Sequence, residues 1–314
     1  MAENFVFDEE FYKEEIRWDY KISSQMKKIW AIEIDIALEL ERVCKKYGLK
    51  YVAGYGTMLG AVRHKGYIPW DDDLDFFMPR SDYEILKKVG SEEFKTPYFY
   101  QNAHTDTIIW AFSKIRRSDT TAIEFPNKEA SFNQGIFVDI FPIDDFTDGS
   151  EEKNMVYLLQ RDLWTIITKP ILGYSEIYQP EKNPYKFTME REIVIDLMKL
   201  SRSQQLEEFE SLCNSYYGTS PFCGNIMNEF RANNQIYKSS WFDNIIYLPF
   251  ENIEIPVSAD YDEFLTLLYG DYMTPVKGGS AHEGIFLDPD HPYTDYMTGK
   301  LKFPEGYFNE NNNI

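Results

Sequence analysis

Four aspartates within five positions are the residues of this sequence best suited to chemistry. A glycine-rich run at 54–60 and a basic triplet at 63–65 come just before them. Carboxylates so close together repel one another and raise each other's pKa unless a cation lies between them, whereas glycine N–H groups and basic side chains bind anions. The pattern predicts a metal-bound phosphate at these four residues: Asp71, Asp72, Asp73 and Asp75.

The conformation of this segment decides which acids act together. In an extended chain over 71–77 the side chains alternate between two faces, which puts Asp73 and Asp75 on one face with Asp71, about 7 Å apart from each other. The pair could share one or two divalent ions. Asp72 would face away, in a supporting role or toward a basic partner. Two apolar side chains on its face would enter the core: Leu74 and Phe76.

A third acid and two cations follow farther along the chain. The run 135–142 is rich in β-branched and aromatic residues, as in a buried strand, and Asp139 is the one acid inside it. Because its apolar neighbours would share the core face, Asp139 would lie opposite, where an adjoining strand could bring it to the same metal. Residues 110–117 predict another strand, with Lys114 and Arg116 on one face as contacts for phosphate.

The surrounding elements are predicted from periodicity and from turn signals. Residues 25–46 have apolar residues at three- and four-residue steps, which is typical of an amphipathic helix, and Gly48 would end it. A strand at 49–53 then leads into the glycines, and a short helix follows at 58–63. After Pro142 the spacing becomes mostly helical, with these predicted segments: helices at 151–168, 188–200 and 203–216, a polar loop at 173–187, and a frayed tail at 301–314.

Composition and charge narrow the class of protein. The 314 residues are 43% hydrophobic and 17% aromatic, enough for a core, and the formal net charge of −20 argues against general binding of nucleic acid. Three cysteines without paired spacing fit neither a disulfide framework nor a zinc knuckle. No apolar stretch reaches the ~18 residues of a membrane helix, and the N-terminus lacks the basic start of a signal peptide, so a cytoplasmic enzyme is expected.

Several familiar motifs are absent from the sequence. A dinucleotide fingerprint would need glycine at position 59, which is Leu59, and no phosphate loop of the G-x-x-x-x-G-K-[ST] type occurs. A calcium-binding EF-hand starting at Asp71 would need glycine at 76 and glutamate at 82, where the chain has Phe76 and Asp82. The histidines form no H-E-x-x-H pattern, and His64 is the one best placed for a ligand.

What remains is a strand, a Gly-Thr turn, a short helix, an Asp-x-Asp pair and a separate Asp, an order that resembles the nucleotidyltransferase fold. In more detail, residues 56–75 resemble the LicD family, as do residues 78–80. Three further blocks resemble the same family: Lys-Ile-Arg at 114–116, Gly-Ile-Phe-Val-Asp-Ile-Phe-Pro at 135–142, and Leu-Tyr-Gly-Asp-Tyr-Met at 268–273.

The resemblance and the helical spacing after Pro142 together predict an α+β fold, with a nucleotidyltransferase-like mixed β-sheet core, flanking helices and a mostly helical C-terminal half. The predicted parts are an N-terminal helical segment at 1–50 that packs on the core, a catalytic core at 51–145, a mostly helical region at 146–300 that completes the site, and the flexible tail at 301–314.

The resemblance also implies an activity. Members of the family transfer phosphocholine from CDP-choline to a sugar hydroxyl of a bacterial surface glycan, and relatives transfer other CDP-linked groups. The expected partners are therefore a CDP-linked donor and a glycan or lipid-linked glycan acceptor, with CMP as product and no nucleic acid. The expected cofactor is Mg²⁺, with Mn²⁺ as an alternative, and the expected place is the cytoplasm or the inner face of the membrane.

Residue roles are carried over by position. Asp73 and Asp75 would hold Mg²⁺ on the donor diphosphate, and Asp139 would complete the metal site and help deprotonate the acceptor hydroxyl. Gly56 and Thr57 would approach a donor phosphate. The other substrate-binding candidates are cations for the leaving CMP, a neighbouring histidine, and aromatic faces for a quaternary ammonium group: Arg63, Lys65, Lys114 and Arg116; His64; and Trp70, with Tyr55, Tyr67 and Trp110.

Two other classes of protein stay open, and so does the donated group. Phosphocholine is the first expectation, but the segment 274–282 departs from the family's usual paired prolines and basic residue before histidine, which leaves glycerol, ribitol or another CDP-linked group as alternatives. A metal-dependent glycosyltransferase would also use an Asp-x-Asp pair, on a nucleotide sugar, but needs neither the Gly-Thr turn nor Asp139. A non-catalytic metal- or glycan-binding module would tolerate loss of Asp139.

Overall fold

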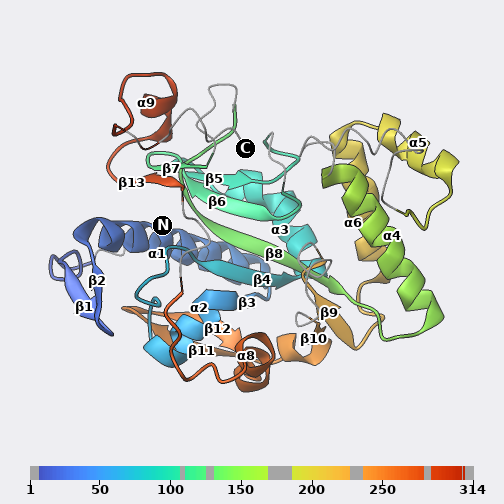
Figure 1. Cartoon of the computed structure of the whole chain (residues 1–314), viewed down its shortest axis with the longest axis horizontal. Coiled ribbons are helices and arrows are strands. Elements are labelled where there is room, and N and C mark those ends of the chain that lie inside the picture. The colour runs from blue at the N-terminus through green and yellow to red at the C-terminus, as the bar shows by residue number, and fades with distance from the viewer. Residues whose placement is uncertain are drawn as a thin grey trace.

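A mixed sheet of seven strands forms the centre of the protein (Figure 1). The computed structural model describes residues 7–106, 110–124, 131–168, 186–226, 236–278, 284–305 and 307. Five strands follow the order β5-β6-β8-β4-β3, and β9 and β10 continue from the far end of β8. β4 and β8 run parallel, and the other neighbours in this sheet run antiparallel. The strands are β3 (Val52–Ala53), β4 (Asp75–Pro79), β5 (Tyr98–Gln101), β6 (Ser113–Arg117), β8 (Ile136–Asp145), β9 (Phe222–Gly224) and β10 (Tyr237–Lys238).

The first long helix, α1 (Ser24–Tyr47), confirms the helix predicted at 25–46. The hydroxyl of Ser23 caps its start by accepting a hydrogen bond from the N–H of Met26 at 3.1 Å. Its end is the predicted Gly48, whose φ of 66° is left-handed, a conformation that glycine adopts without steric cost. The apolar face of α1 is anchored in the core by side chains with no exposed area: Trp30, Ile34, Ile36, Leu40 and Val43.

The two faces of the sheet have different neighbours. The hydroxyls of Ser113 on β6 and Tyr83 on α3 (Arg80–Glu93) hydrogen-bond at 2.7 Å. Arg117, four residues after Ser113 and on the same face of β6, pairs with Asp35 of α1. α1 and α3 therefore pack on the same face, because side chains at alternate positions of a strand share a side. The residues between these positions point to the opposite face.

The acidic segment does not have the predicted conformation throughout. β4 begins at Asp75, so residues 71–74 are not part of a strand and the alternation argument does not apply to them. Leu74 and Phe76 are fully buried, as predicted. Phe77 is fully buried as well, since β4 lies inside the sheet with both faces covered.

The C-terminal half is helical in its first part and mixed afterwards. The helices α4 (Glu151–Thr168), α5 (Arg191–Lys199) and α6 (Arg202–Tyr216) gather at one end of the molecule, close to the predicted positions (Figure 1). Residues 245–258, expected within a mostly helical region, instead form the hairpin of β11 (Ile245–Phe250) and β12 (Ile253–Ser258). The remaining elements are β1 (Glu15–Arg17), β2 (Tyr20–Ile22), β7 (Thr121–Ile123), the 3-10 helix η3 (Ser239–Phe242), α8 (Tyr261–Tyr269), β13 (Phe286–Asp288) and α9 (Tyr293–Met297).

One cluster of buried apolar side chains runs through most of the described chain, from Phe7 to Tyr272. None of the described helices combines the length and the apolar character needed to cross a membrane. The predicted division at residues 50, 145 and 300 stays a prediction. Residues 173–185 of the predicted loop at 173–187 lie outside the described residues, and so does most of the predicted tail at 301–314.

Candidate active site

Three charged residues form a row across the face of the sheet opposite α1 and α3. Asp139 on β8 lies directly opposite Asp75 on β4 and also opposite Lys114 on β6. Paired residues on neighbouring strands project to the same side, so the three side chains share one face. The sequence predicts that an adjoining strand brings Asp139 to the aspartate pair, and in the structure Asp139 lies beside Asp75.

Lys114 is a buried cation, 3% exposed, and not a surface residue. Its Nζ lies 2.9 Å from Oδ1 of Asp139 and donates a hydrogen bond to Oδ2 at 3.2 Å. The ammonium also lies 3.4 Å from the centre of the Phe137 ring and 3.7 Å from the carboxylate of Glu124. Lys114 is thus held by two carboxylates and an aromatic face, which orients Asp139 and compensates its charge.

One oxygen of Asp139 has no hydrogen-bond partner of good geometry. Oδ1 is buried and accepts no hydrogen bond from the described residues, although Nζ of Lys114 lies nearby at 2.9 Å. The ion pair with the ammonium of Lys114 offsets the burial of this oxygen, which keeps a second lone pair for another ligand. Oδ1 is therefore suited to a metal ion or to a substrate proton.

The predicted Gly-Thr turn wraps the start of β4. It forms α2 (Tyr55–Leu59), where the Thr57 hydroxyl accepts a hydrogen bond from the N–H of Asp75 at 2.8 Å. The N–H of Gly54 donates to the carbonyl of Asp75, also at 2.8 Å. A Cβ added to Gly56 would lie 2.5 Å from Oδ2 of Asp71, so only glycine lets this carboxylate approach the turn. Gly56 and Thr57 thus lie against Asp71 and Asp75, and their predicted approach to a donor phosphate stays a prediction.

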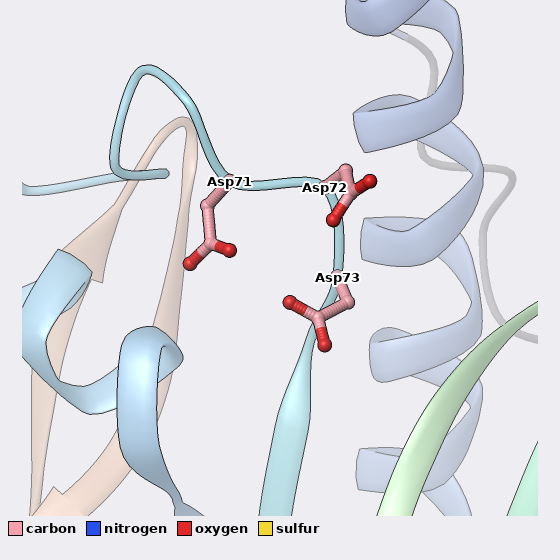
Figure 2. Close-up of side chains that lie close together, drawn as sticks. All are labelled: Asp71, Asp72 and Asp73. Carbon is pink, nitrogen blue, oxygen red and sulfur yellow. The ribbon is translucent and has the colours of Figure 1, made fainter. Parts of the chain in front are cut away.

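A second group of carboxylates lies at the entrance of β4 (Figure 2). Asp71, Asp72 and Asp73 each offer one oxygen, and these atoms lie within 4.8 Å of one another, the one such group of three found among the described residues. In Figure 2, Asp71 and Asp73 point toward α2, whereas Asp72 lies on the side of α1. Asp72 thus faces away from the other two as predicted, although 71–74 form no strand, and its oxygen still lies close to theirs. The predicted ligand set of Asp73, Asp75 and Asp139 is less closely gathered.

The electrostatics of the site match a cluster that attracts cations. Burial, followed by the charge of Asp73, raises the pKa of Asp75 well above its ordinary value, and Asp139 and Asp71 add to the rise. Burial and the charge of Asp73 likewise raise the pKa of Asp71. Several carboxylates that share a buried site cannot all ionise cheaply, and a bound cation removes that cost.

A divalent cation fits these residues by the chemistry of the donor set. Hard cations such as Mg²⁺ take oxygen ligands, mainly carboxylates, and keep several waters. The chain supplies two such groups side by side, the 71–73 cluster and the row of Asp75 and Asp139, with one buried oxygen of Asp139 left without a hydrogen bond.

Two residues of the basic triplet, Arg63 and His64, end the single turn of π-helix η1 (Gly60–His64) that follows α2, and Lys65 comes directly after it. Arg63 donates to Nε2 of His64 at 2.9 Å and to the carbonyl of Tyr272 at 2.6 Å, which joins this turn to the 268–273 block. Burial and the charges of Arg63 and Arg17 lower the pKa of His64 to about 4, so the imidazole is neutral at pH 7. Among the described residues, no hydrogen bond or ion pair joins Arg63, His64 or Lys65 to the aspartates of the site.

The loop after η1 is fastened from outside by Glu251 of the β11–β12 hairpin. Its side chain accepts a hydrogen bond from the N–H of Tyr67 at 3.1 Å and two from the guanidinium of Arg17 at 2.5 and 2.8 Å. Its own N–H donates to the carbonyl of Lys65 at 2.8 Å. Lys65 is exposed, with a left-handed backbone at φ of 58°. Glu251 thereby holds the loop that precedes the aspartates, and Arg17, from near the start of the chain, holds Glu251 in place.

Arg116 is the predicted phosphate ligand with the least access to substrate. It is 1% exposed, and its three nitrogens donate to the side chain of Gln101, the carbonyl of Gly135 and the carboxylate of Glu124. Its guanidinium carbon lies 4.7 Å from the centre of the Phe137 ring. Arg116 therefore joins β5, β6 and the approach to β8, and the structure gives it a stabilising position in place of the predicted contact with phosphate.

Two residues near the acids were not singled out from the sequence. Glu33 of α1 is 2% exposed and accepts a hydrogen bond from the hydroxyl of Tyr67 at 2.8 Å. Burial, and then the three aspartates at 71–73, raises its pKa well above the ordinary value. Burial, followed by the charges of Asp75 and Asp71, raises the pKa of Tyr269 at the end of α8, although the residue is 44% exposed.

A signal for one of these two was present in the sequence. Glu33 lies four residues after Ile29 and four before Ala37, on the buried face of the amphipathic helix. An acidic side chain is rarely buried without a partner, so its position on this face was a signal. Tyr269 belongs to the block at 268–273, but nothing in its local pattern indicated which element it would face.

These features define a class of protein. It is an α+β protein whose mixed sheet carries paired aspartates on neighbouring strands beside a Gly-Thr turn, an arrangement like that of nucleotidyltransferases. Residues 48–170 match the family described as LicD/FKTN/FKRP, nucleotidyltransferase domain. Over these residues the chain has a nucleotidyltransferase domain of the LicD type.

Individual relatives agree with this assignment. Lipopolysaccharide cholinephosphotransferase LicD of Haemophilus influenzae is 26% identical over 235 residues, which are 74% of this chain and 84% of that protein. Uncharacterized protein RP689 of Rickettsia prowazekii is 32% identical over 109 residues, 32% of this chain and 39% of that protein. The first of these relationships supports a transferase.

Proposed function

We propose that this protein transfers phosphocholine from CDP-choline to a sugar hydroxyl of a cell-surface glycan precursor and releases CMP. The observation that carries the proposal is the meeting of Asp75 and Asp139 on parallel strands beside the Gly56–Thr57 turn. The relative from Haemophilus influenzae, named a lipopolysaccharide cholinephosphotransferase and matched over 84% of its length, supports the donated group and a glycan acceptor. The acceptor is a glycan or a lipid-linked glycan, met at the inner face of the membrane.

The carboxylates would hold a divalent ion, Mg²⁺ or Mn²⁺, for the donor diphosphate. Asp73 and Asp75 would be its ligands, and Asp71 lies against Gly56 at the edge of the same site. When bound, the ion neutralises the charge of the diphosphate. Phosphoryl transfer depends mainly on such alignment and charge compensation, which is why the chain needs no covalent nucleophile.

Asp139 supplies the base in this proposal. The acceptor oxygen attacks the phosphorus that bears choline, its proton passes to Oδ1 of Asp139, and the bond from phosphorus to the bridging oxygen breaks, leaving its electron pair on CMP. Oδ1 is the buried oxygen without a hydrogen bond. Lys114, 2.9 Å away, holds the carboxylate in place and compensates its charge before transfer.

Release of CMP tests the proposal. Purified full-length protein is incubated with Mg²⁺ and, separately, with CDP-choline, CDP-glycerol, CDP-ribitol and a set of nucleotide sugars, with and without a sugar acceptor. The expected result is metal-dependent CMP release that is fastest with CDP-choline. Release of a nucleoside diphosphate from a nucleotide sugar would instead establish a glycosyltransferase. No turnover with any donor, together with metal binding that Asp139→Asn leaves unchanged, would establish a binding module.

A further inference from the structure

A pocket of about 380 Å³ opens directly beside the aspartate cluster. Asp71 and Asp72 belong both to the 71–73 cluster and to the pocket wall. A phosphate held at these carboxylates would therefore lie close to the pocket. The remaining walls come from β2 and the start of α1, from the residues before Asp71, and from the segment after α8: Tyr20, Lys21, Ile22, Ser23, Met26, Pro69, Trp70 and Gly278.

The wall of this pocket combines aromatic faces with negative charge. The rings of Tyr20 and Trp70 meet edge to face, with centroids 6.1 Å apart at an interplanar angle of 67°. The carboxylates of Asp71 and Asp72 stand beside them. Aromatic faces next to carboxylates attract a cation and disfavour a second phosphate.

A cation already uses one of these faces. The ammonium of Lys277 lies 5.1 Å from the centre of the Tyr20 ring, within the range of a cation–π contact. The other lysine at the wall, Lys21, is 2.9 Å from Glu14 and 65% exposed, so its charge is drawn outward to a partner of its own. The aromatic wall is therefore positioned to bind an ammonium group.

We infer that this pocket is the subsite for the cationic end of the donated phospho-alcohol, with Tyr20 and Trp70 as specificity-determining residues. The inference rests on the proposed transfer from a CDP-linked donor and adds the residues that would distinguish choline from an uncharged alcohol. In this arrangement the incoming ammonium displaces that of Lys277 from the Tyr20 ring. Trp70 was among the aromatic candidates from the sequence, whereas Tyr20 lies outside the matched segment 48–170.

A matched pair of donors tests the subsite. CDP-choline is compared with its uncharged isostere, CDP-3,3-dimethylbutanol, in which carbon replaces the quaternary nitrogen. Tyr20→Leu is expected to lower kcat/KM for CDP-choline about tenfold, the order expected for one desolvated cation–π contact, and to leave that for the isostere within about twofold. Tyr20→Phe keeps the ring and the rate. Lys277→Met removes the competing ammonium and is expected to lower KM for CDP-choline alone.

The outcomes separate this inference from the proposed function. Equal losses for the two donors in Tyr20→Leu, or no gain in Lys277→Met, would mean that Tyr20 only supports the fold and would overturn the subsite. If no CDP-linked donor is turned over, the proposed function fails, and binding of phosphocholine without metal, measured by calorimetry, decides the subsite. Binding that Tyr20→Leu abolishes and Tyr20→Phe retains supports it, and absence of binding to the wild-type protein overturns it.

Discussion

Asp75 and Asp139 lie directly opposite each other on the two parallel strands at the centre of the sheet. The N–H of Asp139 donates to the carbonyl of Leu74 at 3.0 Å, so the backbone register itself fixes the distance between the two acids. A slip of one residue would turn one of them to the helix-covered face. The pairing of the strands is thus part of the site.

Asp75→Asn is expected to reduce turnover about 100-fold or more, because the amide cannot replace a charged metal ligand. The fold should survive the change. The pKa of Asp75 is raised in the folded protein, so folding favours the protonated form, and the stability of the metal-free protein falls as pH rises above the ordinary carboxyl value. Melting in EDTA should therefore show Asp75→Asn equal to or above wild type at pH 8, with a smaller decline between pH 5 and pH 8.

Asp196→Asn serves as the control for this substitution. Asp196 pairs with Lys199 on the surface, with 75% of its side chain exposed. It should alter neither turnover nor the pH dependence of melting, since exposed ion pairs contribute little. Near-normal turnover in Asp75→Asn would contradict the assignment of Asp75 to the metal.

Lys114→Met is expected to destabilise the protein by about 3–5 kcal/mol, because it leaves Asp139 buried without its cation. The measurement is urea unfolding in EDTA. Adding Asp139→Asn should recover part of the loss, since the unpaired charge is then gone. If the two changes were simply additive, Lys114 would not be the partner that compensates Asp139.

Gly56→Ala should separate folding from activity. The new Cβ would lie 2.5 Å from the Asp71 carboxylate, the movable end of a side chain, so Asp71 swings away and the protein folds. Melting should stay close to wild type, while turnover falls about 100-fold because a charged group at the site is displaced by more than an ångström. Wild-type turnover would show that the position of Asp71 does not matter.

His64 should not titrate in the neutral range. Burial first, and then the charges of Arg63 and Arg17, lower its pKa to about 4. Between pH 6.5 and pH 4 the unfolded chain therefore binds a proton at this ring that the folded protein does not bind. Its contribution to stability is present above the unfolded value of about 6.5 and is lost as pH falls toward 4. NMR titration of the ring should show a midpoint near 4, and His64→Gln should reduce the loss of stability between pH 6.5 and 4.

His104 provides the internal comparison in the same spectra. A hydrogen bond with Glu210 raises its pKa, so its midpoint should lie above the ordinary histidine value. Similar midpoints for the two rings would contradict the burial of His64 against the two arginines.

The sequence was most informative where one local signal decides the structure. The apolar spacing of α1 with Gly48 at its end, and the β-branched run around Asp139, each predicted an element and the face of its side chains. It was least informative where tertiary contacts decide. Residues 71–74 do not extend β4, and Arg116, a basic residue in a phosphate-binding pattern, is fully used by Gln101, Gly135 and Glu124.

The β11–β12 hairpin shows the same limit. Each of its strands contains a proline, Pro249 or Pro256, which lowers the strand signal of the local sequence, and no two-residue turn of the Asn-Gly kind joins them. Its role depends on Glu251, whose contacts with Arg17 and Tyr67 come from distant parts of the chain. No pattern confined to a short window contains that information.

The bonds made by Glu251 bear on how this protein can be dissected. A fragment trimmed to the matched segment 48–170 would lose both Glu251 and Arg17, and with them the partners of the Lys65 carbonyl and the Tyr67 N–H. It would also lose α1, whose Trp30 stacks on Tyr67 with centroids 4.4 Å apart. The segment 48–170 is therefore not an independent folding unit. When it is expressed alone or grafted, the loop before the aspartates should lose its defined conformation.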